Sequence, residues 1–164
     1  MLSFLPSILA LGLAALAAWS LTRGRGSPPE SAAARHAASV ALALSLLIQT
    51  IHFVEEAATG FDVRLGPLFG LPEMPRTAFL VFNLIWIGIW VASIPGLREA
   101  RPLAFFAAWF LAIAGMINGI AHPLLALAAE GYFPGLVSSP FIGLASVWLW
   151  VRLRRATAPR ANPV

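Results

Sequence analysis

Residues 77–94 read TAFLVFNLIWIGIWVASI, a run of eighteen residues without one ionisable side chain. As a helix rising ~1.5 Å per residue, such a run is long enough to cross most of the ~30 Å hydrocarbon core of a bilayer. Further apolar blocks lie on both sides of it, at residues 2–21, 37–58, 102–122 and 136–151. The sequence therefore predicts an all-α integral membrane bundle of about five transmembrane helices, with residues 1–164 forming a single membrane domain.

The composition supports this fold class. The chain is 59% hydrophobic and only 11% charged, with a mean hydropathy of +0.82, whereas about a quarter of the residues in a soluble domain are charged. There is no cysteine, which excludes disulfides, thiolate metal sites and cysteine nucleophiles. The net charge of +4 comes from arginines at the ends of the apolar blocks. We therefore expect the bilayer, and no nucleic acid, as partner; the sequence leaves the oligomeric state open.

The arginines predict an orientation. Arg64 and Arg76 lie between the second and third blocks, and the other nine fall in segments that five spans place on the opposite side of the membrane. These nine are Arg23, Arg25, Arg35, Arg98, Arg101, Arg152, Arg154, Arg155 and Arg160. Because basic residues concentrate on the cytoplasmic side, the C-terminus is expected in the cytoplasm and the N-terminus outside, in a bacterial inner membrane.

Two segments need separate treatment. Residues 2–21 resemble a signal peptide in hydrophobicity, but they lack a basic N-terminal region and are long for a signal sequence, so we favour a retained span. Residues 60–75, GFDVRLGPLFGLPEMP, are too apolar for a free loop. We expect them to lie in the interface or to fold back over the helix ends, because lipid-exposed irregular backbone would leave its amides without partners.

Polar residues gather in the outer part of the second block, where residues 49–56 read QTIHFVEE. At ~100° per residue, Gln49, His52 and Glu56 fall within about 60° of arc on a helix. Glu55 lies about 60° from His52 on its other flank. One helix face thus carries an imidazole flanked by two carboxylates.

The block at residues 102–122 carries a matching face with Gly115, Asn118, Gly119 and His122. The two glycines form a GxxxG pair that allows close approach of a neighbouring helix, which we predict to be the second one. Pro123 is expected to loosen the helix at His122. Asn83 in the third block is expected at about the same depth in the membrane as His52.

A simpler interpretation must be weighed against a functional one. The acidic end of residues 37–58 can simply be wet, and Asn83 or Asn118 can serve as helix–helix hydrogen bonds. However, an ionisable residue costs about 2.5–3.5 kcal/mol at the centre of a span, and less toward its edge. Several such residues in one layer are therefore predicted to converge on one another, on water or on a metal.

The pattern His52-x-x-Glu55-Glu56 resembles the HXXEE family of integral membrane proteins, which is named for this motif. The likeness extends over about residues 38–151 and includes the later Asn118, His122 and Pro123. The resemblance implies membrane residence and the importance of His52, Glu55 and Glu56. It implies no particular reaction.

The leading hypothesis is a divalent metal site, for zinc or iron, because imidazoles and carboxylates are common ligands of both. The candidate ligands are His52, Glu55, Glu56 and His122, and Glu56 is preferred over Glu55 as the primary carboxylate. His52, Glu55 and Glu56 are also the candidate catalytic residues of a metal-dependent intramembrane enzyme that acts on a lipid-like substrate. Gln49, Asn83 and Asn118 are candidate cofactor-binding residues, with Asn118 expected to orient a ligand by hydrogen bonding.

Other functions stay open. Two adjacent carboxylates and a histidine can act without metal as the acid–base pair of an isomerase or cyclase for an isoprenoid- or sterol-like molecule. A small transporter with a Glu/His proton relay is another candidate, although the cytoplasmic halves of the spans have almost no polar lining. The last alternative is an accessory membrane protein in which the polar cluster serves only for packing. The sequence does not identify the substrate, the metal or the reaction.

Overall fold

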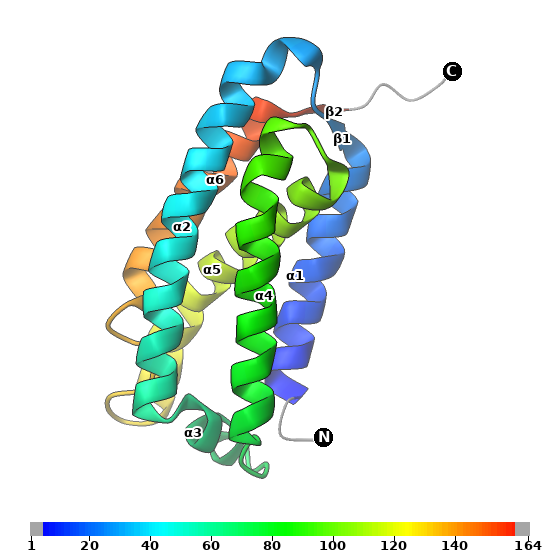
Figure 1. Cartoon of the computed structure of the whole chain (residues 1–164). Coiled ribbons are helices and arrows are strands. Elements are labelled where there is room, and N and C mark those ends of the chain that lie inside the picture. The colour runs from blue at the N-terminus through cyan, green and yellow to red at the C-terminus, as the bar shows by residue number, and fades with distance from the viewer. Residues whose placement is uncertain (1–4, 160–164) are drawn as a thin grey trace.

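Figure 1 shows the computed structural model, which describes residues 5–159 as a bundle of long helices alternating in direction. The helices are α1 (Leu5–Gly24), α2 (Ala32–Thr59), α3 (Phe61–Leu68), α4 (Arg76–Arg98), α5 (Pro102–Ala128) and α6 (Ser139–Ala156). A 3-10 turn, η2 (Pro29–Ser31), precedes α2, and two short strands, β1 (Arg25–Gly26) and β2 (Ala158–Pro159), pair in antiparallel fashion. The expected all-helical class is confirmed.

Within residues 5–159, four helices are long and apolar enough to cross a membrane: α1, α2 with its preceding turn, α4 and α5. The last helix, α6, has only 18 residues, and its final turns carry Arg152, Arg154 and Arg155. Its apolar part is therefore shorter than that of the other four. The structure supports a membrane protein with four candidate spans, and the count of five stays a prediction.

The bundle has central and peripheral helices. In the apolar stretch of α5, 56% of the residues are buried, compared with 17% in α1 and in α4. The outward faces of α1 and α4 carry large apolar side chains, such as Leu13 and Leu84, which are 67% and 59% exposed. An apolar surface of this kind is suited to contact with lipid tails.

Helix α6 packs against both α2 and α5, which contact each other little. The expected GxxxG contact of α5 is therefore formed with α6, and the prediction that it involves α2 was wrong. A Cβ atom added to Gly119 would lie 2.8 Å from the Cα of Gly143, and one added to Gly115 would collide with the Ser146 hydroxyl. The reason is that α6 offers its own glycine, so the two backbones approach most closely there.

The helix bounds also differ from those expected. Helix α5 continues through Pro123 to Ala128, whereas it was expected to loosen at His122. Proline removes a single backbone bond, to the carbonyl of Gly119, and neighbouring helices compensate such losses in apolar bundles. Helix α2 begins at Ala32, before the expected residue 37, directly after the turn that starts at Pro29.

Residues 60–75 fold back over one end of the bundle, one of the two alternatives that their apolar sequence predicts. Helix α3 lies across that end (Figure 1). The Met74 N–H donates to the Asp62 carbonyl at 2.8 Å, and the buried Asp62 carboxylate lies 3.5 Å from Arg76 at the start of α4. Leu65 and Met74 pack on Phe133, so this segment also contacts the loop before α6.

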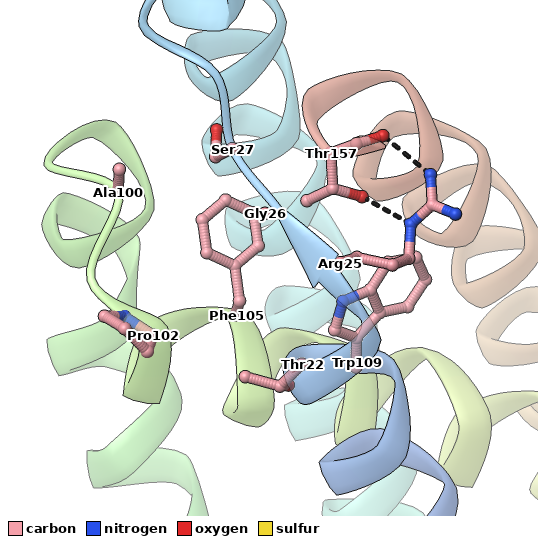
Figure 2. A pocket seen from close by; sticks show the side chains of 9 residues that line it. All are labelled: Thr22, Arg25, Gly26, Ser27, Ala100, Pro102, Phe105, Trp109 and Thr157. Carbon is pink, nitrogen blue, oxygen red and sulfur yellow. Dashed lines mark hydrogen bonds between the residues drawn. The ribbon is translucent and has the colours of Figure 1, made fainter. Parts of the chain in front are cut away.

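The opposite end of the bundle carries eight of the arginines assigned to one side by the sequence; the ninth, Arg160, lies outside the described residues. Figure 2 shows how this end is closed. The Arg25 guanidinium donates to the Thr157 hydroxyl at 2.8 Å and to its carbonyl at 2.6 Å, above the buried ring of Trp109. These bonds fix the end of α1 to the segment after α6. Arg64 and Arg76 lie at the other end, so the arginines are segregated as expected.

Candidate metal centre

Three buried side chains from two helices converge at the end of the bundle that α3 covers. His52 and Glu56 lie one turn apart on α2, and His122 comes from α5. The Oε1 atom of Glu56 lies 3.5 Å from Nε2 of His52 and 3.3 Å from Nε2 of His122. The candidate ligand atoms of the three residues all lie within 4.8 Å of one another. The structure thus brings together two imidazoles and one carboxylate.

These distances fit a metal ion. Zinc binds histidine nitrogen at ~2.0–2.1 Å and carboxylate oxygen at ~2.0–2.2 Å, so neighbouring ligand atoms of a tetrahedral site lie ~3.3–3.5 Å apart. The two distances to Glu56 Oε1 match that edge length, and the ligand atoms of the two imidazoles lie within 4.8 Å of each other. The donor set therefore matches a tetrahedral site along two of its three edges.

The orientation of His122 is set by the loop between α5 and α6. Its Nδ1 atom lies 2.6 Å from the carbonyl oxygen of Pro134. A carbonyl oxygen only accepts, so Nδ1 carries the proton and donates it. In the neutral ring, Nε2 then has a free lone pair, which faces Glu56.

His52 is oriented in the same way by Ser138. Its Nδ1 atom lies 2.8 Å from the Ser138 hydroxyl, which in turn donates its proton to Glu55. With that proton committed, the hydroxyl accepts from Nδ1–H of His52. The Nε2 atom of His52 is buried and has no hydrogen-bond partner among the described residues.

Three acceptor atoms therefore face a common point: Nε2 of each imidazole and Oε1 of Glu56. Three lone pairs directed at one another in a buried place are unfavourable unless a cation or a proton lies between them. Histidine ligands of metals commonly donate their other ring N–H to a carbonyl or a carboxylate. Both rings show such partners here, directly through Pro134 and through Ser138 to Glu55.

Glu55 lies outside the convergent group. Its carboxylate accepts from the Tyr132 hydroxyl at 2.8 Å, from the Val137 N–H at 3.0 Å, and from both the N–H and the hydroxyl of Ser138. Burial raises the pKa of Tyr132. The bond to Thr59 lowers this pKa by a smaller amount, and Glu55 raises it, so the pKa lies above its usual value and the hydroxyl remains a neutral donor. Glu55 thus anchors the loop that orients His52.

The family comparison covers the part of the chain that carries the His52-x-x-Glu55-Glu56 motif. Residues 43–149 match the family described as "Protein of unknown function with HXXEE motif". The chain belongs to the HXXEE family. The matched range contains His52, Glu55 and Glu56 of the motif, and also His122 and Ser138. No curated protein and no solved structure matches the chain.

The loop that orients both rings of the HXXEE site includes a glycine that no larger residue can replace without strain. Gly135 has φ +87°, and a Cβ atom there would lie 2.5 Å from Cε1 of His122 and 2.9 Å from Cε1 of His52. The backbone of Gly135 therefore contacts both imidazoles directly, and the centroids of the two rings are 4.7 Å apart.

Sequence reasoning missed this loop contribution. Residues 132–138, YFPGLVS, supply Tyr132, Pro134, Gly135 and Ser138 to the site. The one signal in the sequence was that a short connection containing Pro and Gly follows the block with His122. Nothing in the spacing indicates which of its backbone and hydroxyl groups face the histidines.

The three predicted amide residues lie beside the centre. Gln49, Asn83 and Asn118 line the same cavity as Glu56 and His122. The Nδ1 atoms of His52 and His122 bond to Ser138 and Pro134, and the expected role of Asn118 as an orienting hydrogen-bond partner stays a prediction. The amide nitrogen of Asn83 donates to the Phe79 carbonyl at 2.9 Å, which leaves its oxygen available to accept.

We call the cavity that these residues line the outer cavity. It has a volume of about 960 Å³ and is bounded by α1, α2, α3, α4 and α5. Its lining is mainly apolar, with aromatic side chains such as Phe79, Trp86 and Trp90 from α4. Glu56 and His122 contribute to the lining, whereas His52 is fully buried behind them. The polar lining residues are Ser7, Gln49, Glu56, Asn83, Asn118 and His122. The candidate metal centre thus opens on one side, toward the outer cavity.

Proposed function

We propose that this HXXEE protein is an integral membrane protein that binds a divalent metal at His52, Glu56 and His122 and acts there on a lipid-like substrate. One observation carries the metal part of this proposal. Nε2 of His52 is buried without a partner and faces a carboxylate oxygen that a second imidazole also faces. Three such acceptors fit a cation that shares their lone pairs.

The donor set favours zinc or iron. Two histidines and one carboxylate form the ligand set of many catalytic zinc sites, which keep a fourth position open, and also of non-haem iron(II) sites. When bound, such an ion supplies Lewis-acid activation of water or of a substrate oxygen in its open position. The open position here would face the outer cavity, because Glu56 and His122 are the two ligands that line it.

The protein's own groups would perform three tasks. Glu55 and Ser138 orient His52, and the Pro134 carbonyl orients His122. The apolar walls of the outer cavity exclude water from the reacting oxygen, which strengthens electrostatic interactions there. The amides of Gln49, Asn83 and Asn118 can hydrogen-bond a polar group of the substrate.

A metal-free acid–base enzyme is the second candidate, and the same geometry favours it. If one imidazole takes up a proton, the Nε2–H can donate to Glu56 at the observed separation of 3.3 or 3.5 Å. Such a pair can move a proton to and from an isoprenoid- or sterol-like substrate. A transporter is disfavoured because the polar lining of the outer cavity lies toward the end that α3 covers.

The proposed orientation of the chain in the membrane places the site relative to the two leaflets. With α6 as a fifth span and the arginine-rich end in the cytoplasm, the site lies near the outer face of a bacterial inner membrane. The substrate would then come from the outer leaflet.

Elemental analysis of protein purified without added chelator tests the metal. We expect about one zinc or iron per chain, as one such site binds one ion. His52→Ala and His122→Ala should each remove it, and Glu56→Gln should strongly reduce it. His36→Ala is the matched control, because His36 is the remaining histidine and lies near the other end of α2. A folded wild-type protein without metal, and without metal uptake on addition of zinc or iron, would favour the acid–base alternative.

A further inference from the structure

The outer cavity is elongated along the bundle. On α4 it extends from Ala78 to Trp90, and on α5 from Phe110 to Ala128. At ~1.5 Å per residue, these ranges correspond to roughly 18 Å along α4 and roughly 27 Å along α5, and the part of α5 from Phe110 to His122 corresponds to roughly 18 Å. The hydrocarbon layer of one leaflet is half of a ~30 Å core, or about 15 Å. The part of the outer cavity between His122 and Phe110 is therefore about as long as one leaflet is thick.

The two ends of the outer cavity differ in chemistry. Glu56, His122 and Asn118 line the half of the cavity nearer α3, inward of apolar residues such as Leu125 and Ala128, whereas Trp86, Trp90 and Phe110 surround the other end. A ligand that satisfies both ends has an oxygen-bearing head and a long apolar tail. A wholly apolar ligand would leave the carboxylate and the amides without partners, at a cost of roughly 1–3 kcal/mol for each buried group.

The lining also restricts the charge of the head. Among the described residues that line the outer cavity there is no arginine, and Glu56 is the single charged side chain. Phosphate groups in proteins are usually met by arginine, lysine or helix N-termini. A divalent ion at the proposed metal centre would leave one net positive charge beside Glu56 and would bind one oxygen of the head. The lining offers no second cation for the other oxygens of a phosphate, so the cavity suits a neutral head, such as an alcohol, an aldehyde or an ester, better than a phosphate.

The walls indicate the route of entry. Helices α1 and α4 both pack on α5 and line the outer cavity from two sides, through residues such as Leu11 and Phe82. Both helices are largely exposed, with apolar outer faces. A ligand that reaches the cavity between them comes from the lipid and does not have to cross water.

We propose that the outer cavity binds a neutral single-chain lipid that enters from the outer leaflet between α1 and α4. Its oxygen head lies at Glu56 and His122, and its tail extends along α4 to Trp90. This inference rests on the proposed function, since it assigns the substrate class of the same site. Straight fatty-chain and linear isoprenoid compounds share this chemistry, and the experiment below separates them.

Photo-crosslinking in nanodiscs tests this binding mode. The probes are a long-chain fatty alcohol and a linear isoprenoid alcohol, each with a diazirine at the tail end, and the labelled residues are mapped by mass spectrometry. We expect saturable labelling near Trp86, Trp90 and Phe110 by at least one probe, and competition by the same alcohol without diazirine. The probe that labels at lower concentration identifies the chain type. A fatty alkyl phosphate with the same tail should compete more weakly.

Two variants give a matched comparison. Ala114 is buried and lines the outer cavity on α5 between Phe110 and His122, so Ala114→Phe should obstruct the tail. An overpacking cost of about 1–3 kcal/mol corresponds to a loss of labelling of roughly fivefold or more. Ile120, on the same helix, is 65% exposed and does not line the cavity, so Ile120→Phe should label normally. Competition on the wild-type protein gives an answer that is independent of how Ala114→Phe folds.

The outcomes separate this inference from the proposed function. Labelling that rises linearly with probe and resists competition would overturn the inference, as would equal competition by the alkyl phosphate. Metal content is measured on the same samples. Bound metal with unsaturable labelling leaves the metal centre standing and removes the lipid site. Saturable labelling near Trp90 without metal supports the lipid site and removes the metal.

Discussion

Oε1 of Glu56 lies 3.3 Å from Nε2 of His122, which has a free lone pair when the neutral ring donates from Nδ1 to Pro134. The two atoms come from residues far apart in sequence and from helices that contact each other little. Their approach depends on the loop before α6, which bonds to both rings. Two acceptors at this distance need a proton or a cation between them.

Ser138→Ala should weaken metal binding without abolishing it. The hydroxyl of Ser138 connects His52 to Glu55, so its removal frees the ring to rotate and leaves both partners less ordered. Loss of such an outer partner typically lowers metal affinity by about 10–100-fold. The affinity is measured by competition with a chromogenic chelator.

Ser139→Ala is the control for this prediction. Ser139 is also buried, but its hydroxyl donates to the Leu136 carbonyl and does not contact either imidazole. Equal losses of affinity in the two variants would indicate a general effect on the loop and would argue against the orienting role of Ser138.

Much of the fold could be predicted from the sequence because long apolar runs have few structural solutions in a bilayer. Residues 77–94 indicate a spanning helix by length and composition alone. The packing order was less accessible: the glycines of α5 predict a close contact but do not identify its partner. Gly143 of α6 provides that partner, and a single glycine in the last block carried too weak a signal to be chosen over α2.

The candidate site was accessible where helical periodicity applies. His52 and Glu56 are one turn apart, so their common face follows from the sequence, and His122 follows from its depth. The contribution of residues 132–138 was not accessible, because loop backbone has no period. The Pro134 carbonyl and the position of Gly135 against both rings depend on the path of the chain through space.

Gly119→Ala should destabilise the protein, whereas Gly88→Ala should not. A Cβ atom at Gly119 would lie 2.8 Å from the Cα of Gly143, which is backbone and cannot turn away, while one at Gly88 meets no atom within 4 Å. Overpacking costs about 1–3 kcal/mol, whereas alanine in an open helix position is favourable by up to about 1 kcal/mol. Thermal unfolding in detergent measures both. Equal midpoints would contradict the close contact of α5 with α6.

The orientation can be tested with single cysteines, since the chain has none of its own. Glu73 and Glu99 are exposed and lie at opposite ends of α4. By the arginine distribution, Glu73→Cys should react in intact cells with a membrane-impermeant maleimide, and Glu99→Cys should react only after the cells are opened. The reverse pattern would place the candidate metal centre on the cytoplasmic side.

Gly135→Ala should disrupt the site more than it disrupts the bundle. The residue has φ +87°, where a side chain costs about 1–3 kcal/mol. A Cβ atom would also lie 2.6 Å from Nδ1 of His122, the atom that donates to Pro134, and 2.9 Å from Cε1 of His52. Both rings would have to move, so we expect metal content to fall well below half that of the wild type, since ligand geometry must be kept within ~0.2 Å.

Gly131→Ala provides the comparison in the same loop, since a Cβ atom there meets no atom within 4 Å and the residue has no positive φ. Its metal content and its unfolding midpoint should match those of the wild type. Helical circular dichroism of Gly135→Ala should stay close to the wild-type spectrum, because the Gly135 carbonyl accepts from the Ser139 N–H at the first residue of α6 and the substitution keeps that carbonyl. If Gly135→Ala keeps its full metal content, the loop does not press on the imidazoles as described. In that case the orientation of His52 and His122 would have to come from the helices alone.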